Sequence, residues 1–178
     1  PKFIGHRGAC GIAPENTMSS MLKAKTLGLN FVEVDVKITK DKVPVLLHDE
    51  TLDRTTNGSG LCCDFTFNEL QKLDAGIWFN ENYKNEKILS LEKCIDFVSN
   101  NQMGINIELK PNLGKEKENV ISVKKILETK KNINKYFISS FDKLSLKYAS
   151  EILSGIPRGY LINNNHTSLS EIVTICNK

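Results

Sequence analysis

The sequence predicts an α/β fold, because short apolar runs typical of strands alternate with longer amphipathic stretches typical of helices. A second observation is that charged and polar side chains gather where several predicted strands end. The composition is that of an ordinary globular chain, with 40% hydrophobic and 25% charged residues among 178. This length suits one substantial core, so we expect a single domain over residues 1–178.

The N-terminal elements are a strand, a helix and a pair of strands. Residues 3–6 form a short apolar run, and residues 14–17 supply residues that favour a helix start. Gly28 suits the left-handed position that follows a helix end. Residues 31–38 alternate between apolar and polar side chains, and residues 43–47 repeat the strand pattern.

The connection between these two strands is too short for a crossover helix, so we expect a tight hairpin. Such a hairpin sets position 35 roughly opposite position 48 and places Asp35 beside His48. A turn after a strand commonly collects polar residues, so those that follow His48 are left out of the site. They are Asp49, Glu50, Asp53 and Arg54.

The segment from about 50 to 90 is irregular and is expected to form a small inserted lobe beside the site. Regular alternation then resumes toward the C-terminus. Strands are expected at 105–109, 136–140 and 159–162, and helices at 91–100, 116–130, 143–153 and after Ser168.

Three acidic residues suggest a metal site. Glu33 and Asp35 are two apart on a strand, so their side chains share one face, and Glu108 ends another strand. Valines occupy the opposite face of the first strand, and a carboxylate pair that faces inward requires a cation or a buried partner. An oxygen-only set of ligands favours Ca²⁺ or Mg²⁺ over zinc. The alternative is that the pair lies on an exposed edge strand.

Basic residues and histidines follow the same strands. Arg7 and Lys110 can contact phosphate oxygens, the first as a two-pronged fork and the second as a point charge. His6 and His48 can carry protons near neutral pH. Together these groups predict a metal-assisted phosphodiesterase. Two alternatives are that His6 is a satisfied core histidine, and that Lys110 only pairs with Glu108.

Charge and apolar patterning exclude several classes. The net charge of +3 is small, and basic residues are interspersed with acidic ones, so neither nucleic acid nor an anionic membrane is an expected partner. The apolar runs are too short for a transmembrane helix. Five cysteines without metal-type spacing indicate free thiols in a reducing compartment, so we expect a cytoplasmic protein.

The residues also carry a family resemblance, in order over positions 3–162. The chain resembles the glycerophosphodiester phosphodiesterase family, within the superfamily of phospholipase C-like phosphodiesterases. The matching motifs are His6-Arg7-Gly8-Ala9, Ala13-Pro14-Glu15-Asn16-Thr17, Glu33-Val34-Asp35-Val36, His48-Asp49, Thr51-Leu52-Asp53-Arg54-Thr55-Thr56-Asn57-Gly58 and Asn106-Ile107-Glu108-Leu109-Lys110.

The resemblance implies a TIM-type (β/α)8 barrel with its site at the carboxyl ends of the strands. It also implies hydrolysis of a small-molecule glycerophosphodiester to glycerol 3-phosphate and an alcohol. Either water attacks directly, or a substrate hydroxyl attacks first to give a cyclic phosphate. In that family the matching residues have three roles: metal ligands (Glu33, Asp35, Glu108), general acid and base (His6, His48) and phosphate contacts (Arg7, Lys110).

One departure from the family pattern is length, because a complete barrel has eight strand–helix units and this chain ends after the sixth. We therefore expect an open barrel that lacks its C-terminal part, with an oligomer as one way to cover the open edge. Two alternative functions follow. One is a lysophospholipase D-like enzyme with an apolar site mouth, and the other is a non-catalytic barrel fragment that binds phosphodiesters.

Overall fold

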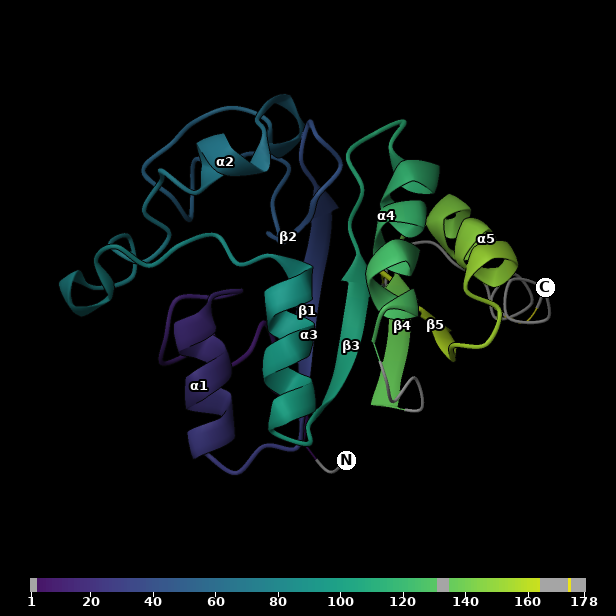
Figure 1. Ribbon diagram of the computed structural model, residues 1–178, viewed down its shortest axis with the longest axis horizontal. Coiled ribbons are helices and arrows are strands. Elements are labelled where there is room, and N and C mark those ends of the chain that lie inside the picture. Colours follow the sequence, from purple (N-terminus) through teal and green to yellow (C-terminus); the bar gives the residue numbers. More distant parts are fainter. Residues whose placement is uncertain (1–2, 131–134, 164–172, 174–178) are drawn as a thin grey trace.

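The computed structural model describes residues 3–130, 135–163 and 173, and its centre is one five-stranded sheet (Figure 1). The strands lie in the order β2-β1-β3-β4-β5. Neighbours pair in parallel except for β2, which is antiparallel to β1. The strands are β1 (Phe31–Ile38), β2 (Pro44–Leu46), β3 (Gly104–Leu109), β4 (Tyr136–Ser140) and β5 (Arg158–Tyr160).

Helices cover one face of this sheet (Figure 1). Parallel strands need a crossover connection, and α3, α4 and α5 supply one each before β3, β4 and β5. The helices are α1 (Met18–Thr26), α3 (Leu91–Asn100), α4 (Glu116–Glu128) and α5 (Lys143–Ile152). This is the strand–helix alternation that the sequence predicts.

The core between sheet and helices follows the period of two in β1. Val32, Val34 and Val36 are fully buried and belong to the same apolar cluster as residues of α1, α3, α4 and α5. The intervening side chains, Glu33 and Asp35, therefore lie on the other face of the sheet. Apolar packing thus fixes which face of β1 carries the acids.

The first helix begins and ends as its sequence predicts. The Thr17 side chain accepts a hydrogen bond from the Ser20 backbone, and Ser20 bonds back to Thr17 as a capping box. Gly28 follows the last turn with a φ of +78°, the left-handed conformation that glycine adopts without steric cost. The helix start fixes where the loop before it approaches the sheet.

The hairpin is present, but its predicted register is wrong by one residue. Val36 lies opposite Leu46, and the Leu47 backbone donates to the Asp35 carbonyl, so position 35 faces position 47 rather than 48. The cause is the loop, because Thr39 pairs with Val43 around three connecting residues, the last of which is left-handed. His48 therefore lies just beyond the ladder.

The N-terminal strand is smaller than predicted. Among residues 3–6, only Gly5 makes a β-bridge, in parallel with Val32 of β1. The Glu33 backbone donates to the Gly5 carbonyl near the start of β1, and Lys37 pairs with Val45 of β2 near its end. The hairpin arm and the N-terminal segment thus share one edge of β1.

Residues between β2 and α3 form short turns around a second apolar cluster. Its helical segments are η1 (Cys62–Asp64), α2 (Phe67–Leu70) and η2 (Glu81–Tyr83). Leu52, Cys62 and Leu70 are fully buried in that cluster, beside Val45 of β2. The assignment of 1–178 as one domain with an inserted lobe stays a prediction, as does association with a second chain.

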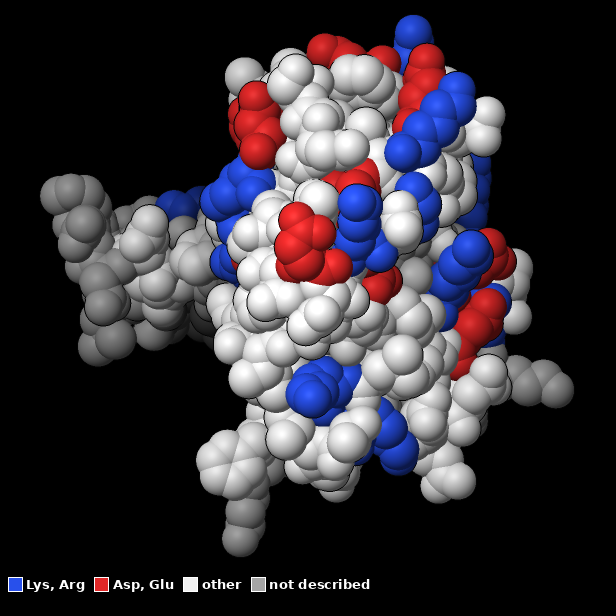
Figure 2. All heavy atoms as spheres, turned by 90° about the vertical axis from the view of Figure 1, so that its left-hand side faces the viewer, with Lys and Arg blue, Asp and Glu red and all other residues white. Residues whose placement is uncertain are grey.

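Some predictions lie outside the described residues: the final helix after Ser168 and the thiol of Cys176. Within the described part, Cys10, Cys62, Cys63 and Cys94 are free, and no helix is long and apolar enough to cross a membrane. On the face drawn in Figure 2, basic and acidic side chains lie among one another, as the sequence indicates.

Candidate active site

Three carboxylates meet on the face of the sheet opposite the helices. Asp35 of β1 and Glu108 of β3 are direct partners across the parallel pair, and Glu33 precedes Asp35 by two residues. One oxygen from each lies within 4.8 Å of the others. All three residues are buried, with relative exposures of 8%, 1% and 7% for Glu33, Asp35 and Glu108. The strand register therefore assembles the predicted acidic cluster.

The electrostatics of this cluster call for a cation. Burial, reinforced by the charges of Asp35 and Glu108, raises the pKa of Glu33 to about 8 from its usual 4.5. Glu33 Oε1 and Asp35 Oδ1 are buried and have no hydrogen-bond partner among the described residues. Unpaired buried oxygens are costly, and a hard divalent cation would satisfy them. The residues present thus fit a divalent metal ion.

Asn16 holds the second of these carboxylates. Its amide nitrogen donates to Asp35 Oδ2 at 2.9 Å, and its amide oxygen accepts from the Asp35 backbone at 3.2 Å. The residue is buried and has a φ of +58°, which asparagine tolerates better than most side chains. Contacts of this kind fix the direction in which a ligand oxygen points.

The loop that carries Arg7 is tightly turned over Glu33. The Arg7 backbone donates to Glu33 Oε2 at 2.9 Å, and its guanidinium Nε lies 3.2 Å from Asp35 Oδ2. Arg7 and Gly8 are both left-handed, with φ of +49° and +81°. A Cβ on Gly8 would lie 2.4 Å from Ser20 Oγ, so only glycine fits there. The close approach of the loop to α1 thus places the Arg7 guanidinium next to the carboxylates.

A second cation reaches the cluster from the end of β3. Lys110 Nζ lies 3.0 Å from Glu108 Oε1 and 3.7 Å from Asp35 Oδ1. The same ammonium lies 5.6 Å from the centre of the Phe141 ring. The alternative that Lys110 pairs with Glu108 alone is therefore wrong. Arg7 and Lys110 thus both contact Asp35 of the acidic cluster.

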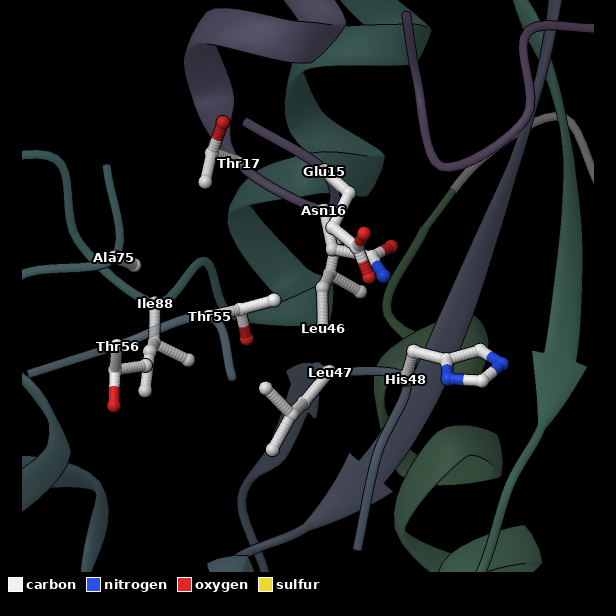
Figure 3. A pocket seen from close by; sticks show the side chains of 10 residues that line it. All are labelled: Glu15, Asn16, Thr17, Leu46, Leu47, His48, Thr55, Thr56, Ala75 and Ile88. Carbon is white, nitrogen blue, oxygen red and sulfur yellow. The ribbon is translucent and has the colours of Figure 1, made fainter. Parts of the chain in front are cut away.

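The two histidines have different surroundings. His6 Nε2 lies 3.9 Å from Glu33 Oε2, and 63% of its side chain is exposed, so the core-histidine alternative is wrong. His48 Nδ1 lies 2.6 Å from Asp49 Oδ1. Because a carboxylate only accepts, Nδ1 carries the hydrogen and Nε2 is left for a ligand. In Figure 3 the His48 ring points away from the side chains of Leu47 and Ile88.

An open cavity of about 310 Å³ lies at one side of the cluster, next to Glu108. His48, Glu108 and Lys110 line it, together with the apolar side chains of Leu113 and Phe141. The structure thus places the seven predicted residues in one region: six are linked through contacts with the acidic cluster, and His48 faces the same cavity as two of them.

Sequence reasoning missed several residues that touch the site. Lys37 is the next inward position of β1 after Asp35, is 2% exposed, and donates to the Lys110 carbonyl at 2.8 Å. Its place in the alternation is a signal that could have found it. Asp49 and Arg54, which the sequence placed outside the site, contact His48 and Glu15 instead. Its position next to His48 is a signal that could have found Asp49, whereas no local pattern could have found Arg54.

Comparison with known proteins identifies the family. The model of the glycerophosphoryl diester phosphodiesterase family matches residues 6–174. The chain is 37% identical over 162 residues to a glycerophosphodiester phosphodiesterase of Caldanaerobacter subterraneus, covering 89% of this chain and 65% of the relative. It is 35% identical over 172 residues to the glycerophosphodiester phosphodiesterase of Bacillus subtilis, covering 89% and 58%. The chain thus spans about two thirds or less of the length of these two relatives.

A solved structure agrees in fold. A phosphodiesterase of Oleispira antarctica, crystallised with its product sn-glycerol-3-phosphate, is 36% identical and superimposes with a TM-score of 0.92 over 98% of this chain and 71% of its own. The strand–helix units described above are accordingly those of a TIM-type α/β fold. By its match to the family model and its identity to these relatives, the chain belongs to the glycerophosphoryl diester phosphodiesterase family.

Proposed function

We propose that this chain hydrolyses glycerophosphodiesters to glycerol 3-phosphate and an alcohol in a reaction that depends on a divalent metal ion. The observation that carries the proposal is the buried cluster of Glu33, Asp35 and Glu108, which contains two oxygens without a hydrogen-bond partner among the described residues. Two cations and a histidine contact the same carboxylates. The product bound to the Oleispira antarctica relative supports the same substrate class. Such a cluster could hold a divalent cation beside a bound phosphodiester.

Arg7 and Lys110 would bind the phosphate. Both lie at ion-pair distance from Asp35, so their positive charge is directed at the site. When a phosphodiester binds, its oxygens offer these cations a second anionic partner. The two side chains would hold the phosphorus with one face toward the attacking oxygen and the other toward the leaving alcohol.

His6 and His48 would move the protons. One imidazole takes the proton from the attacking oxygen as the new P–O bond forms, and the other gives a proton to the departing alcohol oxygen as its P–O bond breaks. His48 is oriented for such a role, because its Nδ1 is bonded to Asp49 and its Nε2 remains available. The contact of His6 with Glu33 directs the other ring toward the same cluster.

Glu33, Asp35 and Glu108 would hold Ca²⁺ or Mg²⁺, since their oxygens suit both hard cations. A bound cation would supply neutralisation of phosphate charge and polarisation of the attacking oxygen. The attacking group is either water or a glycerol hydroxyl of the substrate. In the second case a cyclic phosphate forms first and water then opens it.

A lysophospholipase D-like activity is the second candidate, because the cavity has an apolar mouth. Leu113 is 93% exposed and Phe141 48% exposed, and both line the cavity beside Lys110. Apolar groups at such a mouth could accept one acyl chain of a lysophospholipid. A water-soluble diester would leave them in contact with water.

The test is release of the alcohol from glycerophosphocholine, glycerophosphoethanolamine and detergent-dispersed lysophosphatidylcholine. The second product is glycerol 3-phosphate for the two water-soluble diesters and lysophosphatidic acid for the lysolipid. Each reaction is run with Ca²⁺, with Mg²⁺ and with chelator. We expect metal-dependent release from a water-soluble diester, lost in His48→Ala and kept in Glu128→Gln, an exposed carboxylate of α4. Faster release from the lysolipid would favour the second candidate. Binding of the diester without release of product would establish a non-catalytic module instead.

A further inference from the structure

The guanidinium of Arg54 lies between two carboxylates from different parts of the chain. Its Nε lies 2.7 Å from Asp49 Oδ2 and its Nη2 3.1 Å from Asp49 Oδ1. Toward Glu15, Nη1 lies 2.9 Å from Oε2 and Nη2 2.8 Å from Oε1. All three nitrogens are therefore used, in two bidentate pairs that join the lobe to the loop before α1.

Each of these carboxylates also holds one of the groups placed at the phosphate. Asp49 Oδ1 accepts from His48 Nδ1 at 2.6 Å. Glu15 Oε1 accepts from Arg7 Nη1 at 2.8 Å. Arg54 is thus separated by a single carboxylate from the imidazole on one side and from the phosphate-binding arginine on the other.

This arrangement differs from a solvated surface ion pair. The Glu15 side chain is 10% exposed and lies between two guanidiniums. Burial raises the pKa of Glu15, but the hydrogen bonds from Arg54 and the charge of Arg7 outweigh it and leave that pKa below its usual value. The Arg54 side chain is 43% exposed, and on the lobe side its guanidinium carbon lies 6.0 Å from the centre of the Trp78 ring.

Figure 3 shows Glu15 and His48, one residue from each side of the Arg54 network. Glu15 and Asn16 extend from the loop before α1 toward the side on which the His48 ring lies, away from Thr56 and Ile88 of the lobe. Asn16 holds Asp35 while Glu15 holds Arg7, so neighbouring residues of one loop reach an acid and a cation of the site.

We propose that Arg54 is a positioning residue of the diesterase: through Asp49 it sets the ring orientation of His48, and through Glu15 it sets the guanidinium of Arg7. The inference deepens the proposed function and rests on it for its kinetic part. Arg54 touches neither the phosphate nor the reacting atoms. Its planar fork is what the geometry requires, because a lysine ammonium cannot pair bidentately with two carboxylates at once.

The two branches predict separable kinetic effects. Glu15→Gln frees Arg7 and is expected to raise KM at least about fivefold with kcat within about twofold, because binding weakens while proton transfer is intact. Asp49→Ala frees His48 and is expected to lower kcat at least about tenfold with a smaller change in KM. Arg54→Gln and Arg54→Lys are each expected to raise KM and to lower kcat. Lys130→Gln, which removes a surface ion pair with Asp96 remote from this network, should do neither.

A second readout does not need turnover. The His48 ring is followed by ¹⁵N and ¹H NMR in the full chain, with His48→Ala used for assignment. We expect a hydrogen-bonded Nδ1–H signal in the parent chain that is lost in Asp49→Ala and displaced in Arg54→Gln, at unchanged folding by circular dichroism. An active parent chain with Arg54→Gln kinetics within twofold of it, or an unchanged His48 signal, would overturn the proposal. An inactive parent chain in which the signal still responds to Arg54→Gln would count against the proposed function and not against the positioning.

Discussion

Replacement of Glu33 by glutamine tests whether the acidic cluster needs a cation, because it removes one charge and keeps the size of the side chain. In the folded, metal-free chain the Glu33 carboxyl has a pKa of about 8, against its usual 4.5. The unfolded chain therefore releases this proton at lower pH than the folded chain. The free energy of unfolding must then fall as pH rises from about 4.5 to about 8.

The magnitude follows from the size of that interval. Each pH unit corresponds to about 1.4 kcal/mol, so ionisation of Glu33 costs the metal-free fold on the order of 5 kcal/mol over the whole interval. The pKa values of Glu15 and Asp49 are lowered instead, so the stability they contribute is complete above the usual carboxyl range. A comparison between pH 5.5 and 8 therefore excludes these two carboxylates, and the difference between the parent chain and Glu33→Gln in that range isolates the contribution of Glu33.

The assay is urea unfolding in the presence of chelator, at several pH values between 5.5 and 8. We expect the parent chain and Glu128→Gln to lose several kcal/mol of unfolding free energy across this range, and Glu33→Gln to lose far less. Added Ca²⁺ or Mg²⁺ should restore the parent chain at high pH and leave Glu33→Gln nearly unaffected. Parallel pH profiles for the parent chain and Glu33→Gln in chelator would refute the reasoning.

Three further outcomes are expected. Gly8→Ala should lower stability by about 2 to 4 kcal/mol in thermal unfolding, because the new methyl would lie 2.4 Å from Ser20 Oγ in a left-handed backbone; an unchanged melting temperature would contradict the close approach. Asn16→Ala should weaken metal binding about 10- to 100-fold in calorimetry, since Asp35 loses its amide partner; an unchanged Kd would mean that Asp35 is held by other contacts. Lys37→Met should lower kcat/KM about tenfold with the metal Kd unchanged, because a backbone carbonyl at the end of β3 loses its donor; activity equal to the parent would show that this carbonyl needs no fixing.

The acidic cluster could be predicted because it follows from local periodicity. The alternation in β1 fixed Glu33 and Asp35 on one face, and the parallel pair with β3 brings Glu108 into register with Asp35. The start of the first helix was equally readable, since the Thr17 side chain accepts the hydrogen bond that the sequence indicates. These features depend on residues close together in the chain or on strand order.

The remainder depends on contacts that no local pattern encodes. The hairpin register was missed by one residue because it depends on the left-handed Lys42 in the loop. Arg54 reaches Glu15 across 39 positions of sequence, so its role could not be read from the turn that contains it. The polar composition after His48 correctly predicted a turn in the backbone. The inference that the Arg54 side chain lies apart from the site was wrong.

The most direct test of the central claim is a metal titration of the chelated full chain with turnover of a glycerophosphodiester as the readout. We predict that product release returns as Ca²⁺ or Mg²⁺ fills one site per chain, and that Glu108→Gln neither binds the ion at that stoichiometry nor regains turnover. Full turnover in the continued presence of chelator, or recovery in Glu108→Gln equal to that of the parent chain, would contradict the account.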